Sequence, residues 1–368
     1  MEKGKTQSTK RTAQIKETEV RIGETHTDRS GVRQFFILAM CALFCALPVL
    51  FPWEVKAGEQ VCGAVNEPAP ILWKEPGQWR EYDRLILQKP SAIGAWAKNM
   101  DADQRLELVG KADSQLLYGE QVIILEERGD WLKVAATEHR TALNDLGYPG
   151  WLLKNQVSID EIFLNELQSQ SIAVIAKPFA ILYKNPNLTQ IDLELSYQTR
   201  LPIISAFVWI SSEGEKAVAA VRLPGGGIGF LGWDDLRLAC EIKADRENIV
   251  REANQFLGLA YIWAGTSAYG FDCSGFTMRL YQSQGISLPR DADEQALAGT
   301  AIEIQAMQPG DLLFFAKDGG KGQVYHVGVY AGNGTMIHSP NSRSAVRFDS
   351  IDDGNYLYDY YGARTYIN

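Results

Sequence analysis

Cysteine is scarce in this sequence: there are five in 368 residues, and no two of them form a C-x-x-C pair. A small disulfide scaffold and the commonest zinc-binding signatures are therefore not expected. Basic residues are also outnumbered, with 36 Lys and Arg against 45 Asp and Glu. No long basic stripe offsets this balance, which argues against a nucleic-acid partner. Because hydrophobic residues still make up 46% of the chain, each domain can form an ordinary core, and a disordered chain is not expected.

Long apolar runs are missing too, with one exception. The twenty residues from Gln34 to Trp53 carry no charge, which is enough to cross a bilayer. Residues 1–33 hold eight Lys and Arg against five Asp and Glu and show no hydrophobic period, so we expect a disordered cytoplasmic tail. Residues 34–57 are then a signal peptide or an uncleaved membrane anchor, and the rest of the chain lies outside the cytoplasm. A buried core helix is the alternative interpretation.

An internal repeat follows the apolar run. Short β-rich runs such as Val122–Glu126 and Val218–Leu223 are separated by turn residues, a pattern typical of small antiparallel barrels. We expect a domain duplication, with a first domain and its N-terminal linker over residues 58–165 and a second domain over residues 166–243. The matching positions are Leu116, Tyr118, Val122, Ile124 and Leu125 in the first copy and Leu195, Tyr197, Leu201, Ile203 and Ile204 in the second.

The pattern changes after residue 243. Apolar residues recur at helical spacing over residues 244–258. A glycine-rich loop, a second helix and several β-rich runs come next. A helical half followed by a sheet half predicts an α+β domain over residues 244–368.

Cys273 is the candidate nucleophile. Asp272 is a good N-cap residue, which places Cys273 in the first turn of a predicted helix. A helix N-terminus presents free N–H groups and a partial positive charge. That environment favours the thiolate, which is the nucleophilic form of cysteine.

Two of the four histidines lie on one predicted hairpin. His326 alternates with apolar residues along a strand, and the Gly332-Asn333-Gly334 turn brings His338 back beside it. Cross-strand neighbours on one face can touch, so His326 can contact the thiol while His338 orients its ring. His139 is expected in a polar loop of the first barrel. A metal site of Cys273, His326 and His338 is the rival interpretation.

Four short motifs together resemble the NlpC/P60 family of cysteine peptidases, which have a papain-like core and cleave bacterial wall peptides. The resemblance covers about residues 244–368. It implies that Cys273 is the nucleophile, His326 the base and His338 the orienting residue, with no metal or other cofactor. The motifs are Asp272-Cys273-Ser274-Gly275-Phe276, Pro309-Gly310-Asp311-Leu312, His326-Val327-Gly328-Val329-Tyr330 and Ile337-His338-Ser339.

The repeated domains resemble bacterial SH3-like (SH3b) domains. Two small SH3-like β-barrels followed by an α+β papain-like NlpC/P60 domain is the architecture of the YkfC-like γ-D-glutamyl-L-diamino-acid endopeptidases. In that subfamily the first SH3b domain covers the cleft and requires a free N-terminal L-Ala on the substrate. The resemblance implies that Asp113 pairs with the substrate amine and Tyr148 helps to close the pocket. The residues that it implies around the rest of the site are Tyr261, Asp272, Ser274 and Asp291.

We therefore expect a cysteine peptidase that hydrolyses the γ-D-Glu–L-diamino-acid bond of peptidoglycan peptides (L-Ala-γ-D-Glu-diamino acid). It would be secreted, or held facing the cell wall by residues 34–53. Two other functions stay open: a non-catalytic SH3b wall-binding protein, and an acyltransferase in which an amine captures the thioester. The choice between lysine and meso-diaminopimelate also stays open. In an oxidising compartment, Cys62 and Cys240 are candidates for a disulfide.

Overall fold

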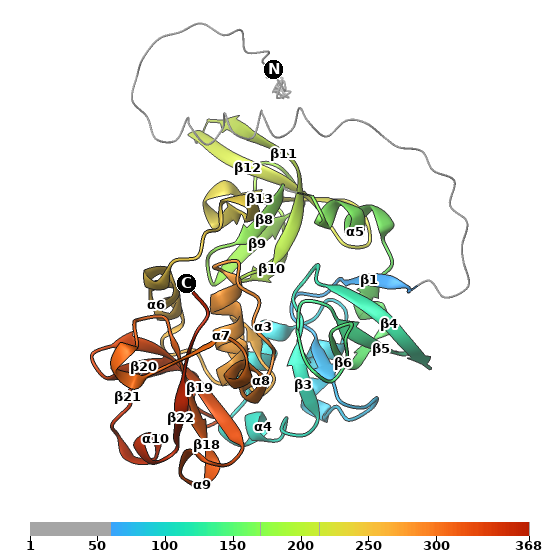
Figure 1. Ribbon diagram of the computed structural model, residues 1–368. Coiled ribbons are helices and arrows are strands. Elements are labelled where there is room, and N and C mark those ends of the chain that lie inside the picture. Colours follow the sequence, from blue (N-terminus) through green and yellow to red (C-terminus); the bar gives the residue numbers. More distant parts are fainter. Residues whose placement is uncertain (1–59, 170, 213, 368) are drawn as a thin grey trace, which may run out of the picture. The chain divides into compact units, whose positions relative to one another are not determined.

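The computed structural model of the chain describes residues 60–169, 171–212 and 214–367 (Figure 1). The predicted cytoplasmic tail and the predicted signal peptide or anchor, residues 1–57, lie outside the described residues. Within the described residues, no helix is both long and apolar enough to cross a bilayer. The exact domain limits also stay predictions.

Two seven-stranded antiparallel sheets follow one another along the chain and share one topology. The strand orders are β3-β2-β6-β5-β4-β1-β7 and β10-β9-β13-β12-β11-β8-β14, so each strand of the second sheet corresponds to the strand seven earlier. This correspondence confirms the predicted duplication. The first sheet contains β1 (Cys62–Val65), β2 (Ile71–Trp73), β3 (Ala112–Gln115), β4 (Gln121–Arg128), β5 (Trp131–Ala136), β6 (Tyr148–Leu153) and β7 (Val157–Ser158).

The second sheet follows helix α5 (Glu161–Leu167). The hairpin of β11 and β12 has the longest strand pairing in either copy. Its outer half extends beyond the residues that cover the core of the domain. The strands are β8 (Ile172–Ile175), β9 (Phe179–Tyr183), β10 (Ile191–Ser196), β11 (Arg200–Ser211), β12 (Gly214–Arg222), β13 (Ile228–Gly232) and β14 (Leu236–Leu238).

The repeated tyrosine of each copy is buried in the core of the next domain. Tyr118 of the first copy packs among the core residues of the second, including Leu195 and Leu201. Its counterpart Tyr197 packs among core residues of the third domain, where its ring meets Phe256 edge-on at a centroid distance of 5.1 Å. From the repeat alone, each tyrosine would be assigned to the core of its own barrel. In the structure each one instead packs into the following domain and so connects consecutive domains.

A helical insertion separates β2 from β3 in the first copy, which the sequence analysis did not predict. It contains α2 (Arg84–Leu87), α3 (Ile93–Asn99) and α4 (Ala102–Leu106). Its apolar side chains, with Trp96 at their centre, pack against Ile262, Ala264 and Tyr269 of the third domain. The insertion therefore contacts the chain segment that leads to Cys273.

The third domain is an α+β unit, as predicted, with a six-stranded sheet in the order β17-β22-β18-β19-β20-β21. Phe276, Leu280 and Tyr281 recur on one face of α7 and pack on the sheet. The helices are α6 (Arg246–Ala253), α7 (Cys273–Gln282), α8 (Ala292–Leu297), α9 (Lys317–Gly320) and α10 (Gly354–Tyr358). The strands are the small pair β15 (Thr266–Ser267) and β16 (Gly270–Phe271), then β17 (Thr300–Ile302), β18 (Leu312–Ala316), β19 (Val324–Gly332), β20 (Thr335–His338), β21 (Arg347–Ser350) and β22 (Tyr360–Thr365).

Cys62 and Cys240, the two candidates for a disulfide, are not joined to each other. Cys62 is a free thiol at the start of β1. The even number of cysteines left beside Cys273 suggested the pair, but cysteine count says nothing about the distance between two Cα atoms.

The start of α7 depends on a glycine. A Cβ atom on Gly275 would overlap the carbonyl oxygen of Gly265 in the preceding loop. The missing side chain lets that loop lie directly against the helix, and the same loop precedes Cys273. Close backbone approach of this kind is a role that only glycine fills without strain.

We expect Gly275→Ala to destabilise the protein by about 2 kcal/mol or more, because the loop and the helix must separate to admit the methyl group. The urea midpoint of unfolding measures this. Gly94→Ala is the matched control, since its Cβ would lie 3.6 Å from the Tyr269 ring, an ordinary contact. That variant should be as stable as the wild type or slightly more stable. Equal midpoints for Gly275→Ala and the wild type would contradict the analysis.

Candidate active site

Cys273 is the first residue of α7, and Asp272 is its N-cap, as predicted. The Asp272 carboxylate accepts a hydrogen bond of 2.6 Å from the backbone N–H of Gly275. This bond fixes the first turn of the helix. The thiol is half-buried and lies against the backbone of Val327, next to His326 on β19.

The protonation state of Cys273 differs from the expectation. Burial raises the pKa of the thiol to about 12, and the neighbouring Asp272 carboxylate acts in the same direction. Hydrogen bonds from the backbone of Val327 and Ser274 lower the pKa, but by less. The free N–H groups of the helix end therefore do not compensate for the loss of water around the sulfur. Burial of the sulfur therefore favours the protonated form of Cys273 in the resting protein.

His326 and His338 lie on the antiparallel strands β19 and β20. Nε2 of His326 and Nδ1 of His338 are 2.7 Å apart, and both rings are buried. The register pairs Val329 with Ile337, so His338 lies opposite Gly328 and diagonal to His326. A side chain at Gly328 would meet the Cβ of His338 at 3.2 Å, and its absence leaves room for the diagonal contact.

Asp349 on β21 extends this pair, and the sequence analysis missed it. Its Oδ2 lies 3.0 Å from Nε2 of His338, and Arg347 holds the same carboxylate at 2.8 Å. Burial acts to raise the pKa of Asp349, but Arg347 and His338 outweigh it and lower the pKa. The carboxylate is therefore ionised. The alternation of Arg347 and Asp349 along β21 was the available signal.

The ionised carboxylate sets the positions of the protons. Burial lowers the pKa of His338 to about 4, so its ring is neutral and carries one proton. Because the carboxylate only accepts, that proton lies on Nε2 of His338, and its Nδ1 accepts from Nε2–H of His326. Burial, and then the charge that His338 can carry, hold the pKa of His326 well below its usual value. The remaining atom, Nδ1 of His326, is left with a free lone pair for a proton.

One cavity of about 410 Å³ contains all six residues predicted around the substrate, together with Cys273. They come from two domains, Asp113 on β3 and Tyr148 on β6 from the first and the others from the third. The full lining is Ala112, Asp113, Tyr148, Tyr261, Trp263, Ala264, Asp272, Cys273, Ser274, Arg290, Asp291, Ala292, Asp293, Gln323, Val324 and Tyr325.

The carboxylates of Asp113 and Asp291 both lie near Tyr148 in this cavity, and the Arg290 guanidinium group acts on each of them. Tyr148 donates a hydrogen bond of 3.0 Å to Oδ2 of Asp291. Burial raises the pKa of Asp291 to about 6, and burial also raises the pKa of Asp113. Removing water from two nearby carboxylates costs free energy that a bound cation recovers. This part of the cavity is therefore suited to an ammonium group.

Tyr261 also lines this cavity and lies near the thiol. Burial, followed by the negative charge that Cys273 can carry, raises the pKa of its phenol well above the usual value. The hydroxyl group keeps its proton and can donate it in a hydrogen bond. Tyr325 borders both this cavity and a second one of about 570 Å³ that His326 lines.

A buried network joins the first domain to this site. Arg290 forms an ion pair of 2.6 Å with Asp272 and a hydrogen bond of 3.0 Å with Oγ of Ser274. Its Nε donates to Oγ of Ser114 at 2.8 Å, and Ser114 follows Asp113 on β3. The Asp113 side of the cavity is thus tied to the N-cap of the Cys273 helix.

His139 lies in the polar loop between β5 and β6, as predicted, and its side chain belongs to the same network. Its ring is fully buried, and Nδ1 lies 2.8 Å from Oγ of Ser114. Arg279 of α7 approaches the other ring nitrogen at 3.3 Å. The surrounding residues look polar in the sequence because they form the contact between domains. As for the alternative metal site, the described residues hold no group of three His, Cys, Asp or Glu that could bind a metal ion.

The comparisons with known proteins agree with this geometry. The NlpC/P60 family matches residues 258–365, and the YKFC SH3b2 domain matches residues 175–237. A γ-D-glutamyl-L-lysine dipeptidyl-peptidase from Bacillus cereus is 37% identical over 82% of this chain and 90% of its own length. One of the same name from Bacillus subtilis is 34% identical over 77% and 92%.

A solved structure shares the whole arrangement. The crystal structure of an NlpC/P60 family protein from Bacillus cereus is 36% identical, with a TM-score of 0.78 over 83% of this chain and 100% of the other. Similarity over nearly the full length of these relatives extends to both SH3b domains as well as the third domain. The chain therefore belongs to the NlpC/P60 family and is a cysteine peptidase.

Proposed function

We propose that this protein is an endopeptidase that hydrolyses the γ-D-Glu–L-diamino-acid bond of peptidoglycan-derived peptides with a free N-terminal L-Ala. The observation that carries the proposal is the shared cavity, where Asp113 and Tyr148 of the first domain lie with Cys273 of the third. The names of the two Bacillus relatives support the same bond, because they specify a γ-D-glutamyl group joined to a diamino acid.

In the proposed reaction, Sγ of Cys273 attacks the γ-carbonyl carbon while Nδ1 of His326 accepts the thiol proton. The backbone N–H of Cys273 and the hydroxyl group of Tyr261 donate hydrogen bonds to the oxyanion. The C–N bond then breaks, and His326 returns the proton to the leaving amine of the diamino acid. Water hydrolyses the thioester with His326 as base, which releases L-Ala-D-Glu.

Attack and proton transfer occur together in this mechanism. Burial raises the pKa of the thiol and lowers that of His326, so it disfavours a resting thiolate–imidazolium pair. The proton moves only as the new C–S bond forms. The hydrogen bonds of His338 and Asp349 occupy Nε2 of His326, so its accepting lone pair lies on Nδ1, to which we assign the thiol proton.

Specificity for a free amine follows from the carboxylates of this cavity. An ammonium group of L-Ala would pair with Asp113, next to the Tyr148–Asp291 hydrogen bond. An acylated amine cannot pair with a carboxylate and would leave it without water or a partner. Peptides still joined to the glycan through L-Ala are therefore poor substrates in this proposal.

We also propose that the peptidase domain works outside the cytoplasm. The charge-free run from Gln34 to Trp53, preceded by a net-positive tail, supports export or anchoring. The substrate class supports the same location, because the wall lies on that side of the membrane.

The direct test incubates the full-length protein with L-Ala-γ-D-Glu-L-Lys and with L-Ala-γ-D-Glu-meso-diaminopimelate, alongside N-acetylated copies of both. We expect mass spectrometry to find L-Ala-D-Glu from the free peptides only. Cys273→Ala should release none, because the nucleophile is missing. Activity in Cys273→Ala would contradict the mechanism, and equal cleavage of the acetylated peptides would contradict the amine site.

Asp113 gives the matched comparison within that test. Asp113→Asn should lower kcat/KM for the free peptide at least about tenfold, because an ion pair shielded from water is lost. Asp130→Asn changes an exposed carboxylate in the β4–β5 turn of the same domain and should have no effect. An equal effect of the two substitutions would assign the loss to net charge rather than to the site.

The role of Asp349 is tested through kcat and pH. In Asp349→Asn the amide N–H₂ can donate to His338, which reverses the proton order along both rings and places a proton on Nδ1 of His326. We expect kcat to fall about tenfold or more with little change in KM. For the wild type, kcat should fall as the pH drops well below 6.5, where His326 becomes protonated, and Cys273 should cause no further change up to mildly alkaline pH.

Asp352→Asn is the control for this substitution, because Asp352 is exposed just beyond β21. It should keep the wild-type kcat and pH profile. A wild-type profile that loses activity at a midpoint above 6.5 would contradict the neutral state assigned to His326, whatever Asp349→Asn does.

Location is tested by fractionation of cells that produce the full-length chain. We expect the protein in the membrane fraction if residues 34–57 are retained, or in the medium as a shorter chain if they are removed. Protease added to intact, wall-stripped cells should degrade the peptidase domain in the first case. Full protection of an intact chain in the soluble cytoplasmic fraction would overturn the proposal.

A further inference from the structure

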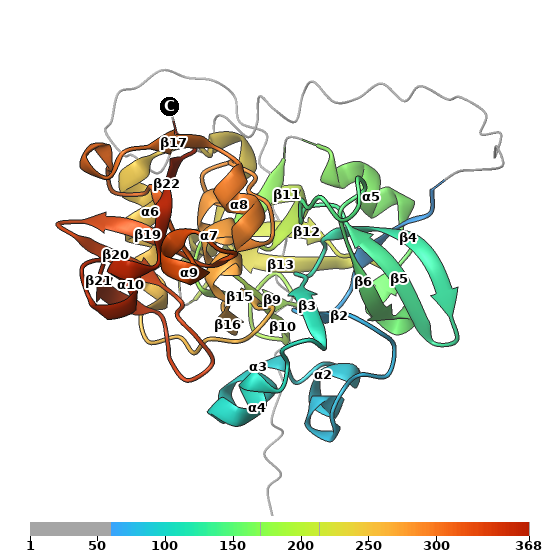
Figure 2. The same ribbon diagram turned by 60° about the horizontal axis from the view of Figure 1, so that its bottom comes forward.

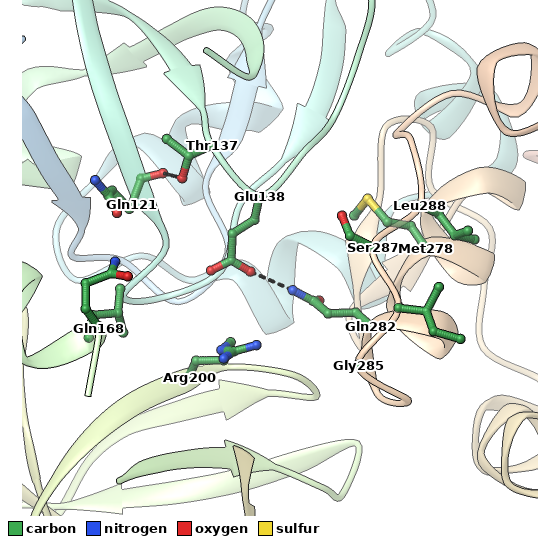
Figure 3. A pocket seen from close by; sticks show the side chains of 12 residues that line it. Gln121, Thr137, Glu138, Gln168, Arg200, Met278, Gln282, Gly285, Ser287 and Leu288 are labelled. Atoms are coloured by element: carbon green, nitrogen blue, oxygen red, sulfur yellow. Dashed lines mark hydrogen bonds between the residues drawn. The ribbon is translucent and has the colours of Figure 1, made fainter. Parts of the chain in front are cut away.

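A third cavity, of about 410 Å³, lies where the two SH3b domains and the third domain meet (Figure 3). It shares no lining residue with the cavity that holds Cys273. Gln121, Thr137 and Glu138 come from the first domain, while Arg200 begins β11 of the second. The remaining lining residues are Leu167 and Gln168 of the connecting segment and Met278, Gln282, Gly285, Ile286, Ser287 and Leu288 of the third domain.

Two opposite charges border this cavity without joining each other. Glu138 uses Oε2 to accept a hydrogen bond of 2.6 Å from Nε2 of Gln282. Arg200, also half-buried, forms no hydrogen bond or ion pair through its guanidinium group within the described residues. Figure 3 shows the two side chains at the same opening, reaching it from different domains. No ion pair joins them within the described residues, and both side chains line the same cavity.

The surroundings favour a ligand that carries both charges. Burial, and then the nearby Glu120 carboxylate, raise the pKa of Glu138, while the charges of Arg200 and Arg279 and the hydrogen bond from Gln282 act in the opposite direction. A cation at Glu138 and an anion at Arg200 would each replace missing water. The amide groups of Gln121 and Gln168 add neutral hydrogen-bonding partners, and Met278, Ile286 and Leu288 supply apolar contacts. The volume falls in the range of small-ligand sites.

We propose that this junction cavity binds an unblocked α-amino acid or dipeptide, whose carboxylate pairs with Arg200 and whose ammonium group pairs with Glu138. A zwitterion is favoured over a simple anion or cation because either would leave one of the two side chains without a partner. This binding site is separate from the active site and goes beyond the proposed reaction, since no group at Cys273 takes part.

The test titrates the full-length protein with L-alanyl-L-alanine in a calorimeter, with the N-acetylated, amidated dipeptide as the uncharged probe. We expect saturable binding of the zwitterion in the millimolar range or tighter and none of the capped probe. Arg200→Gln and Glu138→Gln should each weaken binding about tenfold or more, because one charged hydrogen-bonding pair is lost. Arg251→Gln, an exposed arginine on α6, should leave binding unchanged.

The active site must be separated from this site, because it is proposed to take free amines as well. Asp113→Asn should keep the junction binding, and Arg200→Gln should keep peptide cleavage at the wild-type rate, which also shows that the variant is folded. Binding that disappears in Asp113→Asn but persists in Arg200→Gln would place the dipeptide at the active site alone and overturn the proposal. Absence of saturable binding, or equal binding of the capped probe, would overturn it too.

Discussion

The buried ion pair between Arg290 and Asp272 is the interaction on which the site depends. Asp272 caps the helix that carries Cys273, and Arg290 reaches across to Ser114 of the first domain. One guanidinium group thus fixes both the nucleophile and the strand that holds Asp113. A buried arginine satisfied from two domains is costly to leave without either partner. The substrate cavity is therefore built by the contact between domains, and neither domain contains it alone.

The histidine pair shows how a buried site can hold a base without a charge. Burial shifts the pKa values of the Cys273 thiol and of both imidazoles toward their neutral forms. Asp349 is the ionised group at the end of the hydrogen-bonded series His326–His338–Asp349. It is partly exposed and is held by Arg347. Its charge directs the protons of two rings without placing a full charge beside the thiol. Orientation, rather than a preformed thiolate, is what this arrangement provides.

Local sequence patterns predicted the parts of the site that depend on short-range chemistry. The N-cap preference of aspartate predicted the place of Cys273, and strand alternation with a glycine turn predicted that His326 and His338 lie together. The cavity residues Asp113 and Tyr148 came only from the family resemblance, because no local pattern links them to Cys273. Asp349 and the burial of His139 were missed since each depends on which element lies alongside, a matter of tertiary packing. The high pKa of the thiol was missed for the same reason.

The duplicated domains hold the third domain with equivalent edge strands. On β3 of the first copy, the backbone carbonyl of Gln115 accepts from the Thr266 hydroxyl group at 2.6 Å. On β10 of the second, Oγ of Ser196 accepts from the backbone N–H of Ala268 at 2.9 Å. Figure 2 shows β15 and β16 beside both edges. Unpaired edge strands commonly bind another segment, and here both bind the loop that runs into Asp272.

This arrangement explains why a domain without residues in the substrate cavity is still part of the site. The second SH3b domain lines no part of the cavity around Cys273. Its strand β10 nevertheless binds the loop that runs into Asp272, and β3 of the first domain binds the same loop. Gly275 lets the same loop lie on α7. The position of the thiol relative to His326 thus depends on three contacts made just before the helix begins. Duplication supplied two matching edges, and only the first copy also supplies residues to the cavity.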